Sequence, residues 1–326
     1  MRVGIIGYGN MGQVHSDVLH VLAKSSEIEV TAVAEQKEEL QQLAKTLWPD
    51  VAIYPEGSEM LETEVLDAVH ICVPNYLHTR YTKQALSLGI PVFLEKPACL
   101  KRMEGQELSQ AEADSVAWAA VGQVVRYFTE YEYLKHIYDE RTYGELKSLR
   151  MSRRGERPAP WFLDGEKSGS VIMDLHIHDV DFIRHLLGTP EQIRVNRTHY
   201  PEGAANHIVA RFGYGKNFVL AEAFWDVSSA APFVAEYHAC FEQGTVVYHN
   251  QKEKCLTVYR ENGEVEHPDL NEEHVEEVNG RMPYYKEIKA FYQALFTGEK
   301  KDVVSLTDAL ETLEILWKEQ EIPDKN

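Results

Sequence analysis

The chain has 326 residues, with 33 Lys and Arg against 52 Asp and Glu, so its formal net charge at pH 7 is −19. Such a charge repels phosphate backbones and anionic lipid, so we expect no nucleic-acid partner and no membrane partner. The length exceeds what one compact core usually holds and predicts about two domains.

The four cysteines and the apolar runs predict where the protein resides. Cys72, Cys99, Cys240 and Cys255 stand far apart and form no C-x-x-C pair, which is typical of reduced thiols. No apolar run reaches the ~18 residues of a membrane span. A strand-like VGIIG follows Met1 and Arg2 directly, so we expect no signal peptide. We therefore predict a cytoplasmic protein.

The first third of the chain alternates short β-branched runs with helical patterns. Apolar runs of this length, separated by helices, indicate buried parallel strands in βαβ units. We therefore predict an α/β Rossmann domain, a doubly wound parallel sheet, over residues 1–122. The expected strands are 3–7, 28–35, 68–74, 91–97 and 116–124, and the helical patterns are 11–24, 37–47, 77–88 and 101–114.

Residues 123–326 predict a second, α+β domain for substrate binding and oligomerisation. A strand-like segment at 146–154 leads through a loop to a helical stretch at about 169–187. The extended segments that follow predict a large, mostly antiparallel sheet covered by helices on one face; they are 193–200, 206–214, 216–227, 233–243, 244–250 and 255–261. Two amphipathic helices, 282–297 and 304–320, end the chain and could pack back on the first domain. We expect a cleft at the boundary near 122–126.

The stretch GYGNMG follows the first strand and opens a helix, which predicts a dinucleotide-binding turn. Gly7 permits the tight turn, Gly9 lets the backbone approach a pyrophosphate, and Gly12 allows close helix–strand packing. Asn10 and Met11 begin the helix, where free N–H groups favour negative charge. A glycine-rich turn without a ligand is the less favoured alternative in this strand–turn–helix setting.

Glu35 ends the second strand, at the place where an acidic group bonds the ribose 2′-hydroxyl of a dinucleotide. A carboxylate there repels the 2′-phosphate of NADP, and no arginine stands beside it. The sequence therefore favours NAD over NADP. The alternative is a solvated loop charge.

Polar residues end two of the predicted strands, where ligands bind in open α/β sheets. The segment VPNYLH (73–78) follows one strand, and Glu95-Lys96-Pro97 abruptly ends another. Proline fixes the exit of the chain, and an X-Pro bond at such a turn can be cis. Lys96 would then point an ammonium into the cleft. Before this context is weighed, a surface lysine at a strand end is the favoured alternative.

The stretch DLHIHDVD (174–181) carries enough carboxylates and imidazoles to suggest a metal site. On a helix, however, His176 and His178 point about 200° apart, too far to share one ion. Apolar residues at 173, 177, 180, 183, 186 and 187 favour a helix over a strand. Asp174 and His178 then share one face, and we expect no bound metal. A structural polar stripe of Asp174, His178, Asp181 and His185 remains the alternative.

These motifs together resemble the glucose–fructose oxidoreductase/inositol dehydrogenase/rhizopine catabolism (Gfo/Idh/MocA) family. The matching pieces run in family order: GIIGYGNMGQVH, VPNYLH, the EKP element, VGQVVRYF and SGSVIMDLHIHDVDFIRHLLG, although Gly169-Ser170 replaces the usual Gly-Gly. The resemblance implies that Lys96, Asp174 and His178 surround a substrate carbon facing the nicotinamide. It places Pro74, Asn75, His78 and Glu95 near the cofactor and, more loosely, Arg126 and Tyr284 on the substrate side.

The implied reaction is hydride transfer between NAD and a sugar, inositol or related polyol. Histidine is the natural base near neutral pH, so His178 is the expected proton acceptor, oriented by Asp174, while Lys96 bonds the reacting oxygen. Trp161, in the loop 153–167, is expected either to stack on a sugar or to anchor the loop; Arg153, Arg154 or Arg157 there could meet an anion. The resemblance also implies a homodimer or homotetramer. The alternative function is a non-catalytic NAD- and sugar-binding sensor.

Overall fold

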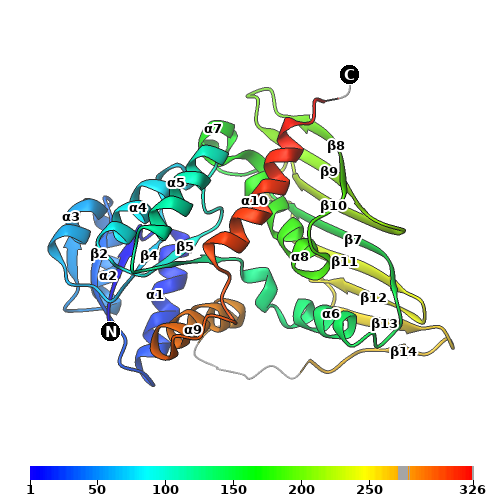
Figure 1. Cartoon of the computed structure of the whole chain (residues 1–326), viewed down its shortest axis with the longest axis horizontal. Helices are drawn as coiled ribbons and strands as arrows, with labels where there is room; N and C mark the ends of the chain where they lie inside the picture. Colours follow the sequence, from blue (N-terminus) through cyan, green and yellow to red (C-terminus); the bar gives the residue numbers. More distant parts are fainter. Residues whose placement is uncertain (271–277, 279, 325–326) are drawn as a thin grey trace. The chain divides into compact units, whose positions relative to one another are not determined.

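A computed structural model of the chain describes residues 1–270, 278 and 280–324 (Figure 1). They form two compact units. The first unit takes residues 1–127 and the described residues of 274–311. The second unit takes the described residues of 128–273 and 312–326.

The first unit is built on a six-stranded sheet in the order β3-β2-β1-β4-β5-β6, with every neighbouring pair parallel. This is the doubly wound order that reverses at β1, so the Rossmann prediction is confirmed. The strands are β1 (Arg2–Ile6), β2 (Glu29–Ala34), β3 (Ala52–Tyr54), β4 (Ala68–Ile71), β5 (Val92–Glu95) and β6 (Ala119–Gly122). The helices between them are α1 (Asn10–Ala23), α2 (Glu38–Leu47), α3 (Gly57–Thr63), α4 (His78–Ser87) and α5 (Arg102–Ala113).

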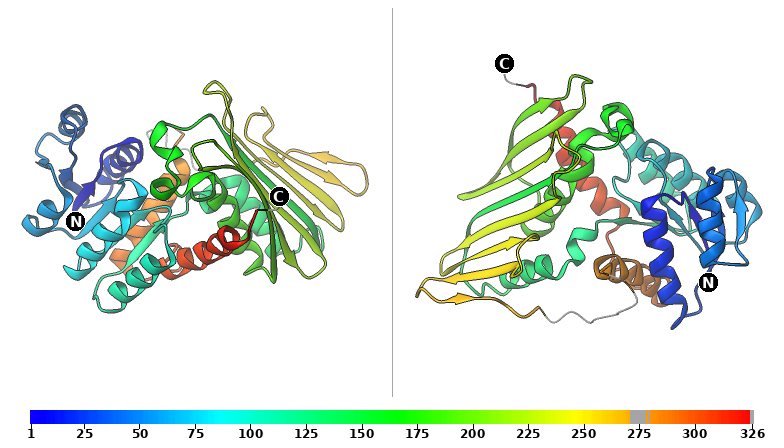
Figure 2. Two further views of the ribbon diagram at one scale, coloured as in Figure 1. Left: turned by 90° about the horizontal axis from the view of Figure 1, so that it is seen from above. Right: turned by 180° about the vertical axis from the view of Figure 1, so that it is seen from behind.

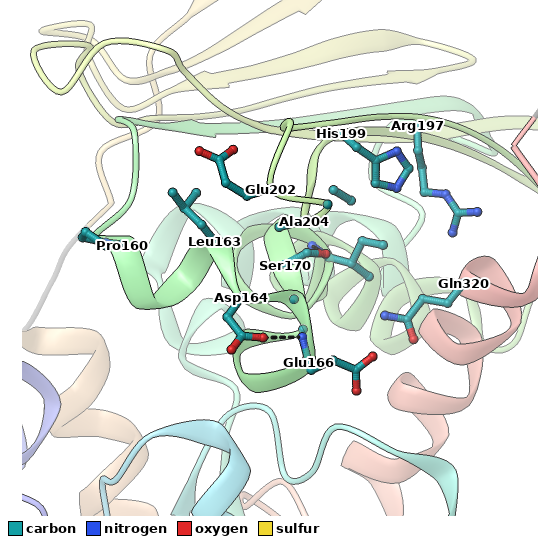
Figure 3. A pocket seen from close by; sticks show the side chains of 15 residues that line it. Pro160, Leu163, Asp164, Glu166, Ser170, Arg197, His199, Glu202, Ala204 and Gln320 are labelled. Carbon is teal, nitrogen blue, oxygen red and sulfur yellow. Dashed lines mark hydrogen bonds between the residues drawn. The ribbon is translucent and has the colours of Figure 1, made fainter.

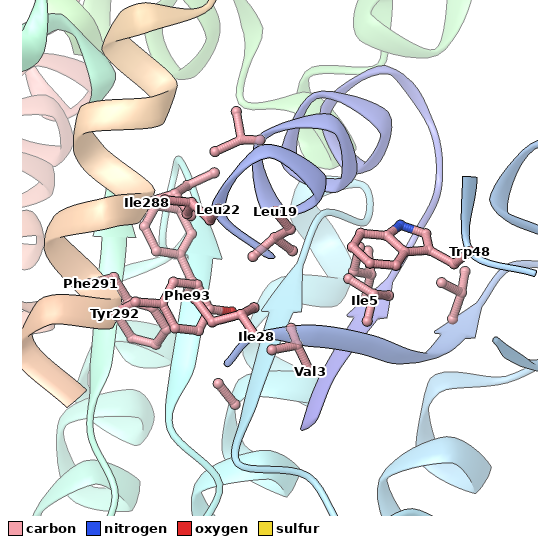
Figure 4. Packing of buried hydrophobic residues seen from close by; sticks show 14 of the residues in the cluster. Val3, Ile5, Leu19, Leu22, Ile28, Trp48, Phe93, Ile288, Phe291 and Tyr292 are labelled. Carbon is pink, nitrogen blue, oxygen red and sulfur yellow. The ribbon is translucent and has the colours of Figure 1, made fainter. Parts of the chain in front are cut away.

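A late helix, α9 (Met282–Thr297), belongs to the first unit and completes its core. Ile288, Phe291 and Tyr292 of α9 join Leu19 of α1 and Phe93 of β5 in one buried cluster (Figure 4). Burying aromatic and branched side chains supplies most of the free energy that holds such layers together. The chain therefore returns to its first domain after forming most of the second.

The second unit is built on an eight-stranded sheet in the order β14-β13-β12-β11-β7-β10-β9-β8. All neighbours are antiparallel except β7 and β10, which run parallel, so the mostly antiparallel sheet is confirmed. A parallel pair needs a long crossover, which the helices and strands between β7 and β10 provide. The strands are β7 (Leu146–Gly155), β8 (Gln192–His199), β9 (Ala205–Tyr214), β10 (Asn217–Trp225), β11 (Val234–Phe241), β12 (Gly244–His249), β13 (Leu256–Arg260) and β14 (Val265–Glu266).

Helices cover one face of this sheet (Figure 2). From α6 (Thr129–Asp139), the ring of Tyr131 lies 5.4 Å from Tyr237 of β11 and 4.9 Å from Phe182 of α8 (Ile177–Leu187). Tyr131 thereby joins the sheet to both helices in one core. The short α7 (Gly165–Ser168) and the helix α10 (Leu306–Glu321) complete the helices. Among the described residues, no helix has both the length and the apolar character needed to cross a membrane.

Candidate functional site

The glycine loop of the first unit joins β1 to α1 in a shape that requires two of its glycines. Gly7 has φ +87°, and a Cβ there would lie 2.6 Å from the carbonyl oxygen of Cys72. A Cβ on Gly12 would lie 2.1 Å from the carbonyl oxygen of Gly7. Around Gly9, by contrast, no atom of the described residues lies within 4 Å of an added Cβ, apart from the neighbouring backbone. The loop is packed on its inner side and open beside Gly9.

Helix α1 begins at Asn10 with Gly9 as its N-cap residue, and no side chain caps it. The first N–H groups of a helix have no intrahelical acceptor and carry the positive end of the helix dipole. Asn10, Met11 and Gly12 supply these groups next to the open space at Gly9. The donor set fits a pyrophosphate.

Glu35 follows β2 and holds the glycine loop with its carboxylate. Its Oε2 accepts a bond from the backbone N–H of Tyr8 at 2.8 Å, and its Oε1 accepts from Gln36 and Lys37 at 2.9 Å each. A carboxylate can accept about four hydrogen bonds, so capacity for a hydroxyl donor remains. The acidic group therefore lies at the end of the loop, with its charge supported by backbone donors.

The segment after β4 contains Pro74, Asn75 and His78. Asn75 begins a 3-10 turn (Asn75–Leu77), and His78 is 1% exposed. The His78 ring bridges the carbonyl oxygens of Val73, at 2.9 Å, and Pro97, at 2.7 Å. Burial lowers the pKa of His78, although these two carbonyls act in the opposite direction. Its ring ties the two strand-end loops together from inside the unit.

The turn Glu95-Lys96-Pro97 follows β5, and its Lys96–Pro97 peptide is cis. Glu95 is 7% exposed; its Oε1 accepts from His15 Nε2 at 2.9 Å, and its Oε2 accepts from the N–H of Lys96 at 3.2 Å. Burial works against ionisation, but the hydrogen bond from His15 and the nearby charge of Lys96 hold the pKa of Glu95 below its ordinary value. The carboxylate therefore faces the interior, and Lys96 follows it at the strand end.

The segment DLHIHDVD lies in the second unit as a helix with an irregular start. Ile172–His176 form a π-helical turn, and α8 continues from Ile177. Asp174 and His178 are both partly exposed, whereas His176 is fully buried. π-turns occur frequently at functional sites. The structure thus divides the two histidines between the surface and the interior.

Asp174 and His176 have different partners in the second unit. Asp174 Oδ2 accepts from the indole Nε1–H of Trp225, at the end of β10, at 3.0 Å. His176 Nε2 lies 3.3 Å from Oε1 and 3.2 Å from Oε2 of Glu319, which is fully buried on α10. His176 is therefore engaged in holding the helix to α10. Across the described residues, no three or more His, Cys, Asp or Glu side chains are placed to hold a metal ion.

Side chains from outside the segment 174–181 hold two of its aspartates, Asp179 and Asp181. Arg153 of β7, which is 6% exposed, donates to Asp179 Oδ1 at 2.9 Å and to the hydroxyl of Tyr131 at 3.1 Å. Burial raises the pKa of Asp179, while Arg153 counteracts that effect. Asp181 Oδ1 accepts from the hydroxyl of Thr312 on α10 at 2.9 Å. Of the three arginines considered for an anion, Arg153 is thus committed to an internal ion pair.

The loop 153–167 borders a hollow of about 910 Å³ within the second unit (Figure 3). Its lining includes Pro160, Leu163, Asp164, Ser170, His199 and Gln320, from the loop, the segment before the π-turn, the end of β8 and α10. Trp161 is 39% exposed, and its ring lies 3.9 Å from that of Phe162. The Trp161 ring therefore packs on the loop itself and keeps part of its surface accessible.

The two residues expected on the substrate side both lie in the first unit. Arg126 pairs with Asp308, with 2.6 Å between Nη1 and Oδ2. Tyr284 of α9 is partly buried against the core cluster. Sequence reasoning missed the Asp308 partner because 182 positions separate it from Arg126 (308 − 126).

Two family models match the chain. Residues 1–123 match the model described as "Oxidoreductase family, NAD-binding Rossmann fold". Residues 131–263 match the model of the GFO/IDH/MocA C-terminal domain. The two matches follow one another along the chain and cover both sheets.

Several curated proteins are similar over part of their length. The myo-inositol 2-dehydrogenase of Thermotoga maritima is 27% identical over 191 residues, which is 58% of this chain and 55% of that protein. The scyllo-inositol 2-dehydrogenase (NADP(+)) IolW of Bacillus subtilis is 26% identical over 66% of this chain and 60% of its own length. The chain thus spans between half and two thirds of the length of these relatives.

Solved structures share the fold. An oxidoreductase from Agrobacterium radiobacter, in complex with NAD+, L-tartaric acid and magnesium, has a TM-score of 0.81 at 15% identity, over 98% of this chain and 96% of that one. Levoglucosan dehydrogenase, in complex with NADH and L-sorbose, has a TM-score of 0.83 at 17% identity, with 98% and 96% covered. At such identities the likeness shows the architecture alone.

Proposed function

Because the chain belongs to the GFO/IDH/MocA oxidoreductase family, we propose that it is a dehydrogenase or reductase acting on the carbinol or carbonyl carbon of a sugar, inositol or related polyol. The observation that carries this proposal is the pairing of two elements in one chain. One is a glycine loop with open space beside Gly9, and the other is the π-turn with the start of α8, which leave Asp174 and His178 partly exposed. The first suits a dinucleotide and the second suits proton transfer.

The proposed cofactor is NAD, which when bound supplies the hydride acceptor or donor. The N–H groups of Asn10, Met11 and Gly12 would hold its pyrophosphate. Glu35 has its carboxylate beside Tyr8 of the loop, where it would accept from a ribose hydroxyl and repel a 2′-phosphate. One relative is named as NADP-dependent, so a direct comparison of the two cofactors tests this preference.

His178 is the proposed proton acceptor in oxidation and donor in reduction. Histidine, whose unperturbed pKa is about 6.5, suits both directions at neutral pH. Asp174, fixed by Trp225, would orient the imidazole and stabilise its charged form. Lys96 would donate a hydrogen bond to the reacting oxygen and favour an alkoxide-like state.

Polyols and sugars are the proposed substrates because relatives carry the names of inositol dehydrogenases.

We further propose a cytoplasmic homodimer or homotetramer that associates through the outer face of the second-unit sheet. That face exposes Phe218 of β10, beside half-buried Leu220 and exposed Arg150. Aromatic residues and arginine are enriched in protein interfaces. The four cysteines are free thiols, as expected in a reducing compartment.

A sensor that binds NAD and sugar without turnover is the competing function. The two functions are separated by NADH formation with a panel of inositols, aldoses and sugar phosphates. We expect turnover on at least one of them, and we expect His178→Ala to lower kcat by about 10²–10⁴ while NAD still binds.

His185→Ala is the matched control for this experiment, because His185 is an exposed histidine on the same helix. We expect it to retain nearly full activity. Full activity of His178→Ala would remove His178 from the proton-transfer role. NAD binding without turnover on any substrate would favour the sensor.

A further inference from the structure

A hydrogen-bond chain of four buried side chains runs through the core of the first unit. The hydroxyl of Tyr292 on α9 lies 2.9 Å from His70 Nε2 on β4. His70 Nδ1 lies 2.8 Å from His15 Nδ1 on α1, and His15 Nε2 lies 2.9 Å from Glu95 Oε1. Four elements of the unit are thus joined by three consecutive hydrogen bonds, and the last ends on the carboxylate beside Lys96.

Aromatic rings exclude water from this hydrogen-bond chain. The His70 ring stacks on Phe93 at 5.1 Å and on Tyr292 at 5.9 Å, and Phe291 meets its edge at 6.1 Å. Phe93, Phe291 and Tyr292 all belong to the buried cluster drawn in Figure 4. In such surroundings a polar atom without a partner carries the full cost of its desolvation. Each hydrogen in the chain must therefore have an acceptor.

That requirement fixes the direction of all three bonds. Within the described part of the chain, the hydroxyl of Tyr292 has His70 Nε2 as its one hydrogen-bond partner, so it must donate there. His70 therefore carries its hydrogen on Nδ1 and donates it to His15 Nδ1. His15 in turn carries its hydrogen on Nε2 and donates it to Glu95. Every donor points towards the carboxylate.

Cys72 lies beside the same nitrogen of His15. Its Sγ lies 3.4 Å from His15 Nδ1, and burial raises the pKa of the thiol well above its ordinary value. A protonated thiol can donate or accept a weak hydrogen bond, so this contact is compatible with Nδ1 of His15 as the acceptor of the bond from His70. Burial also lowers the pKa of His70 well below its usual range, which keeps that ring neutral.

We propose that Tyr292, His70 and His15 are positioning residues, a one-way chain of hydrogen bonds that holds Glu95 as a carboxylate beside Lys96. This hydrogen-bond chain lies within the first unit. It can influence the reaction only through Glu95 and the turn that follows it. The charged or titratable groups that face Glu95 are His15 from α1, Lys96 next to it, His78 from α4 and Cys72 after β4. This inference rests on the proposed function, in which Lys96 bonds the reacting oxygen.

Removal of the first donor tests the role in the reaction. Tyr292→Phe deletes one hydroxyl and leaves the ring, so His70 Nε2 loses its donor and Glu95 becomes easier to protonate. We expect kcat to fall about three- to tenfold and the acid limb of the pH profile to move to higher pH, while NAD affinity stays unchanged. Tyr81→Phe is the matched control, since Tyr81 is another buried tyrosine of this unit, and its hydroxyl donates to Glu56, outside the chain. It should leave the pH profile unchanged.

The hydrogen positions themselves are measurable without any substrate. Long-range proton–nitrogen NMR spectra of the full-length wild-type protein should show His70 protonated on Nδ1 and His15 on Nε2. The opposite tautomer of His70, or a doubly protonated His15, would overturn the inference even if Tyr292→Phe failed to fold. If turnover exists and Tyr292→Phe shares the wild-type pH profile, the inference fails while the proposed function stands. If no substrate turns over, the proposed function fails, and with it the role of the chain in a reaction.

Discussion

The two units stabilise their candidate functional segments with different kinds of buried polar contact. In the first unit, a series of neutral donors from α9, β4 and α1 ends on one carboxylate, Glu95. In the second unit, the π-turn and α8 are held by side chains of opposite charge or matched polarity, as in the pair of Arg153 and Asp179. The first arrangement depends on the tautomers of His70 and His15. The second depends on the charge of Arg153 balancing that of Asp179.

This difference predicts which changes destabilise each unit. A neutral hydrogen-bond chain is disturbed by protonation, because a charged imidazole cannot accept the bond that its neutral form accepts. A buried ion pair is disturbed by loss of one partner, because the remaining charge is left in a medium that solvates it poorly. Lowering the pH should therefore destabilise the first unit before the second. Substitutions that remove a buried charge should destabilise the second unit more than the first.

The largest expected effect is that of Arg153→Met. It leaves the carboxylate of Asp179 buried without its partner, so we expect the free energy of unfolding to fall by about 3–5 kcal/mol in chemical denaturation. Arg154→Met, at the exposed neighbouring position, is the control and should change it by less than about 0.5 kcal/mol. Equal effects of the two substitutions would break the contrast between the units.

The glycine loop gives the next effect, in the first unit. Gly12→Ala places a Cβ against the carbonyl oxygen of Gly7, so the loop must shift, and we expect about 1–3 kcal/mol of lost stability. Gly9→Ala meets no atom, so stability should stay within about 0.5 kcal/mol while NAD binds about tenfold more weakly. Calorimetric titration and thermal unfolding measure both. Unchanged NAD affinity in Gly9→Ala would show that the pyrophosphate does not lie there.

Acidification should weaken the first unit through His70. The pKa of His70 is lowered in the folded state, so below its ordinary value of 6.5 the unfolded chain binds a proton that the folded chain refuses. Stability is thus present above pH 6.5 and is lost as the pH falls, by up to about 1.4 kcal/mol per pH unit. Urea denaturation across this range should show that slope, and His70→Gln should reduce it. An identical slope in the variant would assign the acid sensitivity to other groups.

The smallest expected effect concerns the support of Asp174. Trp225→Phe removes the indole donor, so we expect about 1 kcal/mol of lost stability and a severalfold fall in kcat with unchanged NAD affinity. Steady-state kinetics at saturating NAD measure the second part. A fall in NAD affinity instead of kcat would contradict the assignment of Trp225 to the catalytic segment.

Much of the fold could be predicted because its signals are local. The strand–turn–helix around Gly7 to Gly12, the hairpin turns of the second sheet and the helix 282–297 each lie within a short window of sequence. Several elements escaped, including the helices α3 (Gly57–Thr63) and α6 (Thr129–Asp139) and two short or irregular elements. The three-residue strand β3 (Ala52–Tyr54) is too short for a period to be read, and the π-turn at Ile172–His176 retains an apolar spacing close to that of an α-helix.

The helical placement of the candidate residues at 174–181 could be predicted, but their partners could not. Helical spacing alone separated His176 from His178, and the structure buries the former and exposes part of the latter. Contacts across long stretches of sequence, such as His70 with Tyr292 and His176 with Glu319, carry no local pattern. They arise only when the helices pack, which is why the interior position of Glu95 was missed.

Transfer of deuterium tests the central claim most directly. The full-length protein would be incubated with NAD and with myo-inositol or aldoses that carry deuterium on their carbinol carbons, and the nicotinamide would then be analysed for the label. Hydride transfer predicts deuterium on the nicotinamide ring with the wild-type protein and with His185→Ala, and a strongly reduced rate with His178→Ala. Tight NAD binding with no label transferred from any substrate would contradict the account and indicate a sensor.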